Sequence, residues 1–398
     1  MNILFLTYGH VSESRGGIDR VTDVLAKAML KRGHQVYMIS SCSPLENEPL
    51  ENFQFILPHS SICCKENIDF LTNFLSNYQI DFIINQSEKY ALLELASKAK
   101  GSVPLASVVH TDPLYLVKGL KDDWDYGRLL KKSWKFILMY PYYLLRHAIR
   151  YYLRAKELKT HHSYFYKNSD AIVLLSERFK YSFLRIIGLD NSPKLFAIPN
   201  PLTLEYAKTN VSAKEKTILF VARLDFSPKR LDRVLKVWNS IKNHNGWQLL
   251  IAGHGTDTEF YQQLASKYQL ADTKFLGRVA ANDLYEKAQI LCLSSTYEGF
   301  GLVLTEALQH CVIPIAFDSF ESVHDIIENG KNGFLIKPFD LKTYKETLKE
   351  LMINDNLRKN VQQSIQKDTE FLNRFSIGNV VDAWENLIIS LKDKKDNR

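Results

Sequence analysis

Short apolar stretches separated by amphipathic ones run through this chain, and this alternation constrains its fold more than any other feature. In the first half the apolar stretches lie at residues 2–7, 34–40, 81–85, 104–110 and 170–176. Helical patterns separate them, for example at residues 17–32 and 88–100. Strands that alternate with helices in this way form parallel βαβ units within a doubly wound sheet. The first half is therefore predicted to be an α/β domain built on one parallel sheet.

The same alternation starts again in the second half. An apolar stretch at residues 193–201 leads into polar residues 206–216, which we interpret as a linker or domain edge. Further strands are expected at residues 217–223, 247–253, 273–277, 288–295 and 311–317. A chain of 398 residues is also too long for one ordinary core. Two α/β domains are thus predicted, and because such sheets bind ligands at the carboxyl ends of their strands, a site is expected in the cleft between them.

Composition narrows the class of protein. With 45% hydrophobic and 24% charged residues, the chain is globular rather than disordered. The net charge of +7 suits an anionic substrate, an anionic membrane surface or nucleic acid, and selects none of them. The five cysteines show no CxxC pair and no Cys/His metal spacing, which favours a reducing compartment. The first apolar run is short for a secretory signal, and no run reaches the ~18–20 apolar residues that span a bilayer.

One segment departs from the alternation. Residues 126–156, here called the basic aromatic segment, contain no acidic residue but many Arg, Lys and Tyr residues and one Trp. One interpretation is a pair of inserted helices whose aromatic side chains pack on the first domain. The other is an interfacial segment, because basic and aromatic residues interleaved at helical spacing suit an anionic membrane surface. Nucleic-acid binding is less favoured, because no RNA- or DNA-binding motif accompanies the segment.

Two features of the first half indicate a ligand site. The adjacent glycines Gly16 and Gly17 follow the first strand and open a helix, where the backbone can approach a ligand and an anion is favoured. A glycine turn after a strand is usually only a turn, so this motif is weak alone. His110 ends the strand predicted at residues 104–110. A lone histidine is more often structural, but a place at a strand end makes a functional role equally plausible.

The stretch at residues 220–235 carries a second set of charges. Arg223 ends a strand and Lys229 precedes a helix, which places a planar fork and a point charge where a diphosphate could bind. The neighbouring Arg230 and Arg233 are interpreted as a solvated basic loop. The DWD triplet of residues 123–125 matches a metal-binding D-x-D only formally, and we interpret it as surface with no metal site.

Two glutamates lie in an otherwise apolar run near the end of the second half. Glu298 is followed by Gly299, Phe300 and Gly301, and Glu306 lies further along the helix predicted next. The glycines at the helix start would leave N–H groups free for phosphate. A helical rise separates the two carboxylates by roughly 8–12 Å, which is too far for a shared proton. That distance is about the separation of the two sugars in a nucleotide-sugar.

These motifs, in this order, resemble glycosyltransferase family 4, whose members are retaining enzymes of the GT-B fold. The motifs are RGGIDRV, AIPNP, VARLDFSPKR, EGFGLVLTE and FSIGNVVDAWENLI. The resemblance implies two Rossmann-like doubly wound domains that face each other across a cleft. It predicts an acceptor-binding domain at residues 1–200 with an insertion at about 114–166, and a nucleotide-sugar domain at 201–374. A C-terminal helix at 375–398 would return to the first domain.

The resemblance also implies a role for each matching residue. The predicted donor-binding residues are Gly16, Gly17, Arg223, Lys229, Glu298, Gly299, Phe300, Gly301 and Glu306. The predicted catalytic residues are His110, Arg223, Lys229 and Glu298.

Within the family pattern, Arg223 and Lys229 would neutralise the diphosphate, and Glu306 would hold the ribose hydroxyls. Glu298, with the backbone of Phe300 and Gly301, would hold the donor sugar. Gly17 would lie close to the diphosphate, and His110 would contact the sugar near the reacting carbon. Transfer would proceed by front-face attack, assisted by the leaving phosphate, with no metal or cofactor. Ala222 and Asp19 stand where the family often has glycine and glutamate.

The function that follows is a retaining transfer of a hexose or N-acetylhexosamine from a nucleotide-sugar, expected to be UDP-linked. The expected acceptors are a lipid-linked oligosaccharide, a lipopolysaccharide, or a capsule or exopolysaccharide precursor. The expected location is the cytoplasm, with peripheral attachment to the inner face of the membrane and no nucleic-acid partner. The alternatives are a GT-B sugar-nucleotide epimerase or phosphorylase, and a non-enzymatic membrane-surface protein. A glycoside hydrolase would use two carboxylates ~5–10 Å apart but has no use for Arg223 and Lys229.

Overall fold

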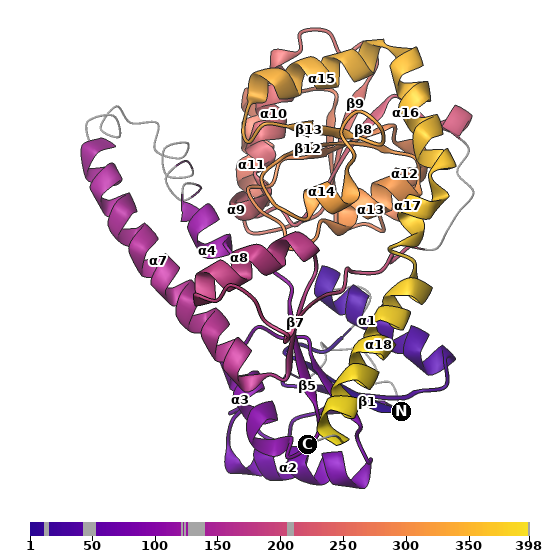
Figure 1. Ribbon diagram of the computed structural model, residues 1–398. Helices are drawn as coiled ribbons and strands as arrows, with labels where there is room; N and C mark the ends of the chain where they lie inside the picture. The colour runs from indigo at the N-terminus through magenta and orange to yellow at the C-terminus, as the bar shows by residue number, and fades with distance from the viewer. Residues whose placement is uncertain are drawn as a thin grey trace. The chain divides into compact units, whose positions relative to one another are not determined.

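The predicted apolar stretches form two separate parallel sheets in the computed structural model (Figure 1). The structure describes residues 1–11, 16–42, 53–120, 122, 125, 140–204 and 211–396. The chain divides into two compact units by its contacts. The first unit comprises Met1–Pro113, Lys156–Thr203 and Arg374–Arg398, and the second comprises Leu114–Ala155 and Leu204–Asn373.

The sheet of the first unit has seven strands in the order β3-β2-β1-β4-β5-β6-β7. These are β1 (Asn2–Thr7), β2 (Gln35–Ser40), β3 (Gln54–Ile56), β4 (Phe82–Asn85), β5 (Leu105–Val109), β6 (Ala171–Leu174) and β7 (Leu195–Ala197). Every neighbouring pair is parallel. All residues of the central strands β4 and β5 are buried, as expected for a parallel sheet covered on both faces.

The helices of the first unit follow the predicted alternation. They are α1 (Gly17–Lys31), α2 (Lys65–Asn77), α3 (Tyr90–Ala99), α8 (Glu177–Ile187) and α18 (Ile377–Asp396), together with the C-terminal part of α7 (Tyr140–Asn168). Helix α8 shows why such helices begin and end where they do. The Ser176 side chain caps its first turn by accepting from the Arg178 N–H, and Gly188 ends it with a φ of 77°.

The C-terminal helix α18 packs beside α1 in the first unit, which confirms the predicted return (Figure 1). Arg32, at the end of α1, forms an ion pair of 2.9 Å with Glu385. Lys392 forms another of 2.6 Å with Asp81. The buried Trp384 and Ile388 add apolar contact, so both burial and charge hold this helix in place.

The sheet of the second unit has six strands in the order β10-β9-β8-β11-β12-β13. They are β8 (Thr217–Val221), β9 (Gln248–Ala252), β10 (Thr273–Gly277), β11 (Ile290–Leu293), β12 (Ile313–Phe317) and β13 (Phe334–Ile336). Its helices are α4 (Tyr115–Lys118), α9 (Phe226–Lys229), α10 (Leu231–Ser240), α11 (Thr258–Lys267), α12 (Asn282–Lys287), α13 (Leu302–Gln309), α14 (Val323–Ile326), α15 (Leu341–Ile353), α16 (Asp355–Lys367) and α17 (Thr369–Asn373), with the 3₁₀ turn η1 (Val211–Ala213). The two Rossmann-like parallel sheets expected from the resemblance are thus present.

The basic aromatic segment is described only from residue 140 onward, and residues 126–139 lie outside the described residues. The described part forms the first half of α7, where Tyr142, Leu145 and Tyr152 are 57%, 64% and 67% exposed. These side chains are therefore exposed, whereas the simpler interpretation expected them to pack on the first domain. By its contacts, Leu114–Ala155 groups with the second unit rather than with the first domain. Among the described helices, none is long and apolar enough to cross a bilayer.

Candidate functional site

The predicted residues of the second unit follow strands that are neighbours in its sheet. Arg223 and Lys229 come after β8, and Glu298 comes after β11. Strands β8 and β11 are paired in parallel, so their carboxyl ends lie at the same edge of the sheet. Such an edge is where open α/β sheets bind ligands.

Lys229 and Glu298 form an ion pair across these two loops. The Nζ atom of Lys229 lies 2.6 Å from Oε1 of Glu298, and the hydroxyl of Ser295 donates to the same oxygen at 2.6 Å. The side chains of Lys229 and Glu298 are 22% and 12% exposed, so both are partly shielded yet reachable. The pair joins the two motifs that were singled out separately in the sequence.

Arg223 lies at the more exposed side of the same loop. Its side chain is 71% exposed and forms an ion pair with Asp225. Burial raises the pKa of Asp225, but the Thr256 N–H and the Arg223 guanidinium outweigh that effect and hold the pKa below its ordinary value. Arg223 is thus anchored by a charged partner while most of its surface faces solvent.

The glycine turn after Glu298 starts helix α13. Gly301 has a φ of 96° and immediately precedes the helix, a conformation that glycine adopts without strain. The side chain of Phe300 is 3% exposed, and its carbonyl accepts from the Ser322 hydroxyl at 3.1 Å. A buried side chain therefore fixes the turn, and the expected placement of the glycines at a helix start is confirmed.

Glu306 has different partners from Glu298. It is 1% exposed, and its Oε2 accepts from the hydroxyl of the fully buried Tyr285 at 2.9 Å. Glu298 is held by Lys229 and Ser295 instead. The two carboxylates are oriented independently, which suits two separate binding tasks better than a shared proton.

His110 lies in the first unit, directly after β5. Its Nε2 is 2.6 Å from Oε1 of Gln86, and its backbone N–H donates to Glu88 at 2.9 Å. Burial lowers the pKa of His110 to about 4, so the imidazole is neutral near pH 7. The Thr111 hydroxyl also donates to Glu88 at 2.9 Å, so Glu88 holds the two residues that follow the strand.

The glycine motif of the first unit opens α1 as predicted. Gly17 is the first residue of the helix, and Gly16 precedes it in an extended conformation. Both glycines are exposed. Arg15, the first residue of the RGGIDRV motif, lies outside the described residues.

Two further glycines, missed in the sequence, shape the loop that carries Arg223. A Cβ on Gly253 would stand 1.8 Å from the carbonyl oxygen of Ala222, and one on Gly255 would stand 2.5 Å from the backbone of Leu224. No side chain fits at such distances, so these glycines allow the loops after β8 and β9 to touch. The G-x-G spacing at the end of the strand predicted at 247–253 was the available signal.

Arg230 and Arg233 correct the sequence interpretation, because they are buried rather than solvated. They are 3% and 5% exposed. Their charges are compensated by carboxylates, among them Asp122 and Asp125. Asp125 belongs to the DWD triplet interpreted as surface, and its side chain is only 13% exposed; Asp123 and Trp124 lie outside the described residues. Among the described residues, no three His, Cys, Asp or Glu side chains gather as metal ligands.

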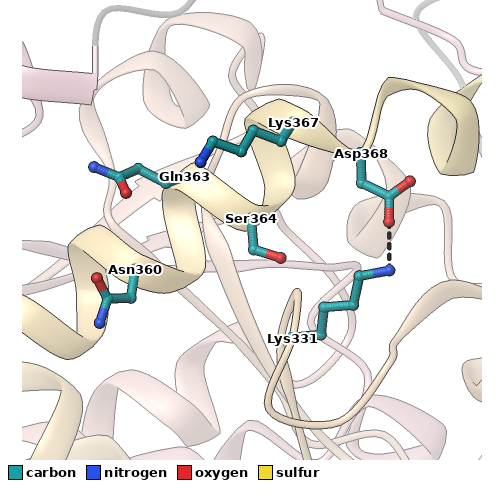
Figure 2. A pocket seen from close by; sticks show the side chains of 6 residues that line it. All are labelled: Lys331, Asn360, Gln363, Ser364, Lys367 and Asp368. Atoms are coloured by element: carbon teal, nitrogen blue, oxygen red, sulfur yellow. Dashed lines mark ion pairs between the residues drawn. The ribbon is translucent and has the colours of Figure 1, made fainter.

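A depression of about 460 Å³ lies elsewhere on the second unit (Figure 2). It is lined by Lys331, Asn360, Gln363, Ser364, Lys367 and Asp368. Lys331 and Asp368 form an ion pair of 2.6 Å beside it. None of the predicted site residues lines this depression.

Comparison with known proteins divides the chain near residue 205, although the first match includes residues 114–155, which the contacts group with the second unit. Residues 15–206 match the model described as Glycosyltransferase Family 4, and residues 204–368 match Glycosyl transferases group 1. An uncharacterized glycosyltransferase of Haemophilus influenzae is 30% identical over 224 residues, which cover 55% of this chain and 61% of that relative's length. The chain thus matches less than two thirds of this relative.

A second relative matches over nearly the whole chain. It is the Campylobacter jejuni GalNAc-alpha-(1->4)-GalNAc-alpha-(1->3)-diNAcBac-PP-undecaprenol alpha-1,4-N-acetyl-D-galactosaminyltransferase, 26% identical over 95% of this chain and 96% of its own length. Among solved structures, Staphylococcus aureus TarM, in a complex that includes UDP, superposes with a TM-score of 0.72. That match is 12% identical and covers 98% of this chain and 100% of the other. It supports the fold.

Proposed function

Because the chain belongs to glycosyltransferase family 4, we propose that it moves a hexose or N-acetylhexosamine, with retention, from a UDP-sugar to a glycan acceptor. That the chain is a glycosyltransferase follows from its family. The donor, the acceptor and the roles of individual residues are proposed from the site. The rival interpretation as a non-enzymatic membrane-surface protein is accordingly set aside.

The observation that carries the proposal is the ion pair between Lys229 and Glu298. An ammonium group 2.6 Å from a carboxylate neutralises it and still has two N–H groups for other acceptors. Lys229 could therefore bind phosphate oxygens while Glu298 accepts hydrogen bonds from sugar hydroxyls. Arg223 would add a planar fork for the same diphosphate.

In the proposed reaction, the acceptor hydroxyl oxygen forms a bond to the anomeric carbon of the donor. The bond between that carbon and the β-phosphate oxygen breaks, and its electron pair leaves on the phosphate. The acceptor proton passes to the same phosphate oxygen, so no separate base is needed. Lys229 and Arg223 would stabilise the negative charge that develops there. His110, a neutral imidazole whose Nε2–H donates to Gln86, would accept a hydrogen bond from a donor-sugar hydroxyl through Nδ1.

A panel of nucleotide-sugars tests the donor. We expect slow hydrolysis of a UDP-hexose or UDP-N-acetylhexosamine in the absence of acceptor, and loss of that hydrolysis in Glu298→Ala. UDP-GlcNAc alone also tests the epimerase alternative, which would release a free sugar isomer without an acceptor. The same rate in wild type and Glu298→Ala would contradict the assignment of the site. The UDP bound in the TarM complex is the reason for preferring this nucleotide.

We further propose that the acceptor is lipid-linked and that α7 binds an anionic membrane surface, as a peripheral contact at the inner face. The Campylobacter relative, whose name includes a polyprenyl diphosphate acceptor, supports the first part. Helix α7 supports the second, because Leu144, Leu145 and Ile149 are each more than half exposed. Arginines recur every four residues along the same helix, at 146, 150 and 154. A wide apolar side beside a basic stripe is typical of interfacial helices.

Vesicle sedimentation tests this contact. We expect the protein to pellet with vesicles containing phosphatidylglycerol and not with pure phosphatidylcholine, and the double variant Leu145→Ser/Tyr152→Ser to lose pelleting. Tyr181→Ser on α8 is the matched control, because Tyr181 is 70% exposed and lies on another helix. Equal loss in the control, or no lipid preference in wild type, would contradict the proposal.

A further inference from the structure

A short segment that follows β5 in the sequence is held against loops of the second unit. This segment, here called the strap, comprises Leu114–Leu120, Asp122 and Asp125. Asp122 is 1% exposed, although it stands among charged residues in the sequence. Its Oδ2 accepts from the Ser227 hydroxyl at 3.0 Å, and its Oδ1 accepts from the Thr296 hydroxyl at 3.0 Å. One carboxylate thus bridges two loops.

Buried charge explains why the strap lies there. Three cations, Arg230, Arg233 and Lys236, face three carboxylates, Asp122, Asp125 and Asp232. The strap contributes two of the three carboxylates. A buried charge is strongly destabilising when its partner is removed, so the arginines need the strap.

Arg230 is the centre of this group. Its Nε donates to Asp232 at 2.9 Å, and its Nη1 donates to Asp122. Arg230 also has a φ of 52°, a conformation that a non-glycine residue adopts only when its surroundings hold it. The guanidinium lies 4.4 Å from the ring centroid of Phe226, which adds a cation–π contact.

The two bridged loops are the loops of the proposed donor pair. Ser227 stands two residues before Lys229, and Thr296 stands two residues before Glu298. The loops also bond directly, because the Thr296 N–H donates to the Pro228 carbonyl at 2.8 Å. Asp122 therefore helps to fix the relative position of the two loops that carry Lys229 and Glu298, although it is not part of that ion pair.

A second contact of the strap reaches Glu298 by another route. Lys118 donates to the carbonyl of Ser319 at 3.1 Å, and the hydroxyl of Ser319 donates to the carbonyl of Ser295 at 2.8 Å. Ser295 in turn donates to Glu298. The strap thus contacts loops after β8, β11 and β12, all at one edge of the sheet.

We propose that Asp122 is a positioning residue for donor binding, which locks the loops of Lys229 and Glu298 in register through Ser227, Thr296 and Arg230. The locking concerns the second unit alone, and its consequence for turnover rests on the proposed function. Asp122→Asn replaces one acceptor oxygen with an NH₂ group, although its neighbours Ser227, Thr296 and Arg230 are all donors. It also removes the negative charge that Arg230 faces. One of the two loops loses its acceptor as a result, so the side chain no longer bridges them.

Hydrogen exchange on the ligand-free protein tests the locking directly. We expect Asp122→Asn to raise amide exchange in residues 226–230 and 294–298 by at least about tenfold. Arg358→Gln is the control, because Arg358 is also buried and charged but bonds Gln289, which precedes β11 at the other end of the strand. Wild-type exchange in both loops of Asp122→Asn would overturn the proposal, whatever the protein's substrate.

Kinetics with the UDP-sugar that is hydrolysed fastest gives the second readout. We expect Asp122→Asn to raise the donor KM by about 10- to 100-fold, since small misplacements of binding groups have effects of this size. Asp122→Glu, which keeps the carboxylate, should recover part of that loss, and Arg358→Gln should leave KM unchanged. An equal KM change in Arg358→Gln would indicate a stability effect and overturn the proposal. A wild type without turnover would contradict the proposed function, while the exchange result would still decide the role of the strap.

Discussion

The two groups of predicted site residues are held by different chemistry. In the first unit His110 is buried, neutral and bonded to an amide side chain and a fixed backbone. In the second unit Lys229 and Glu298 are ionised partners, set beside a buried group of further ion pairs. A neutral acceptor such as Nδ1 of His110 can bind a sugar hydroxyl without competing for phosphate, whereas cations suit a diphosphate. The difference indicates that charge is concentrated where the leaving group would bind.

The largest expected effect comes from removing charge in the second unit. Lys229→Ala and Glu298→Ala should each lower kcat/KM at least about 10³-fold, because transition-state charge loses its partner in a shielded site. His110→Gln, which keeps a neutral acceptor, should lose only about tenfold. Steady-state kinetics on the three variants, with thermal unfolding to verify the fold, makes the measurement. Near-wild-type turnover in Lys229→Ala would contradict the inference that charge is concentrated where the leaving group would bind.

Acid should destabilise the first unit strongly. Burial lowers the pKa values of His110 and His162 to about 4. Because the unfolded chain takes up these protons near pH 6.5, the native state is fully favoured above pH 6.5 and loses stability as pH falls from 6.5 towards 4. The loss should approach about 3 kcal/mol for each histidine.

Urea unfolding at several pH values measures this loss. His162→Gln keeps an N–H donor for the Pro113 carbonyl, which the imidazole Nε2 reaches at 3.0 Å. The variant should be less stable at pH 7 and show a shallower decline between pH 6.5 and 4. A decline as steep as that of the wild type would show that His162 is not the titrating group.

The smallest effect should come from removing a single hydroxyl hydrogen bond in the second unit. Tyr285→Phe removes only the hydroxyl that donates to Glu306 at 2.9 Å. The carboxylate keeps its charge and its buried place, so donor KM should rise a few-fold, equivalent to about 1 kcal/mol. Titration with the donor measures the change, and Tyr344→Phe, which removes a hydroxyl bonded to the Ile315 carbonyl, serves as control. If Tyr285→Phe lowered activity as much as Lys229→Ala does, the orientation of Glu306 would matter as much in this unit as the charge of Lys229.

The fold was largely predictable because most of its strands are apolar stretches separated by amphipathic helices. Every predicted strand is present, from Asn2–Thr7 to Ile313–Phe317. The two strands that were missed, β3 (Gln54–Ile56) and β13 (Phe334–Ile336), have three residues each and lie at sheet edges. A three-residue strand has too few positions to show a period.

The residues of the candidate site were easier to locate than their partners. Lys229 and Glu298 stand in recognisable motifs, but nothing in either motif shows that the two are ion-paired. The burial of Arg230 depends on Asp122, which is 108 residues away along the chain. The local sequence offers the two arginines only Asp232, and the tertiary fold brings them Asp122 and Asp125. The sequence interpretation of Arg230 and Asp125 failed for this reason.

The strap also has a consequence for biogenesis. On the ribosome, residues 114–125 are made about a hundred residues before the arginines that they neutralise, and the first unit is finished only when α18 has been made. Neither unit is therefore a contiguous piece of chain that could be excised at residue 200. A fragment that began at Leu204 would keep Asp232 but lose Asp122 and Asp125, which leaves two arginines with one carboxylate. Dissecting this protein therefore requires joining the strap to the later half.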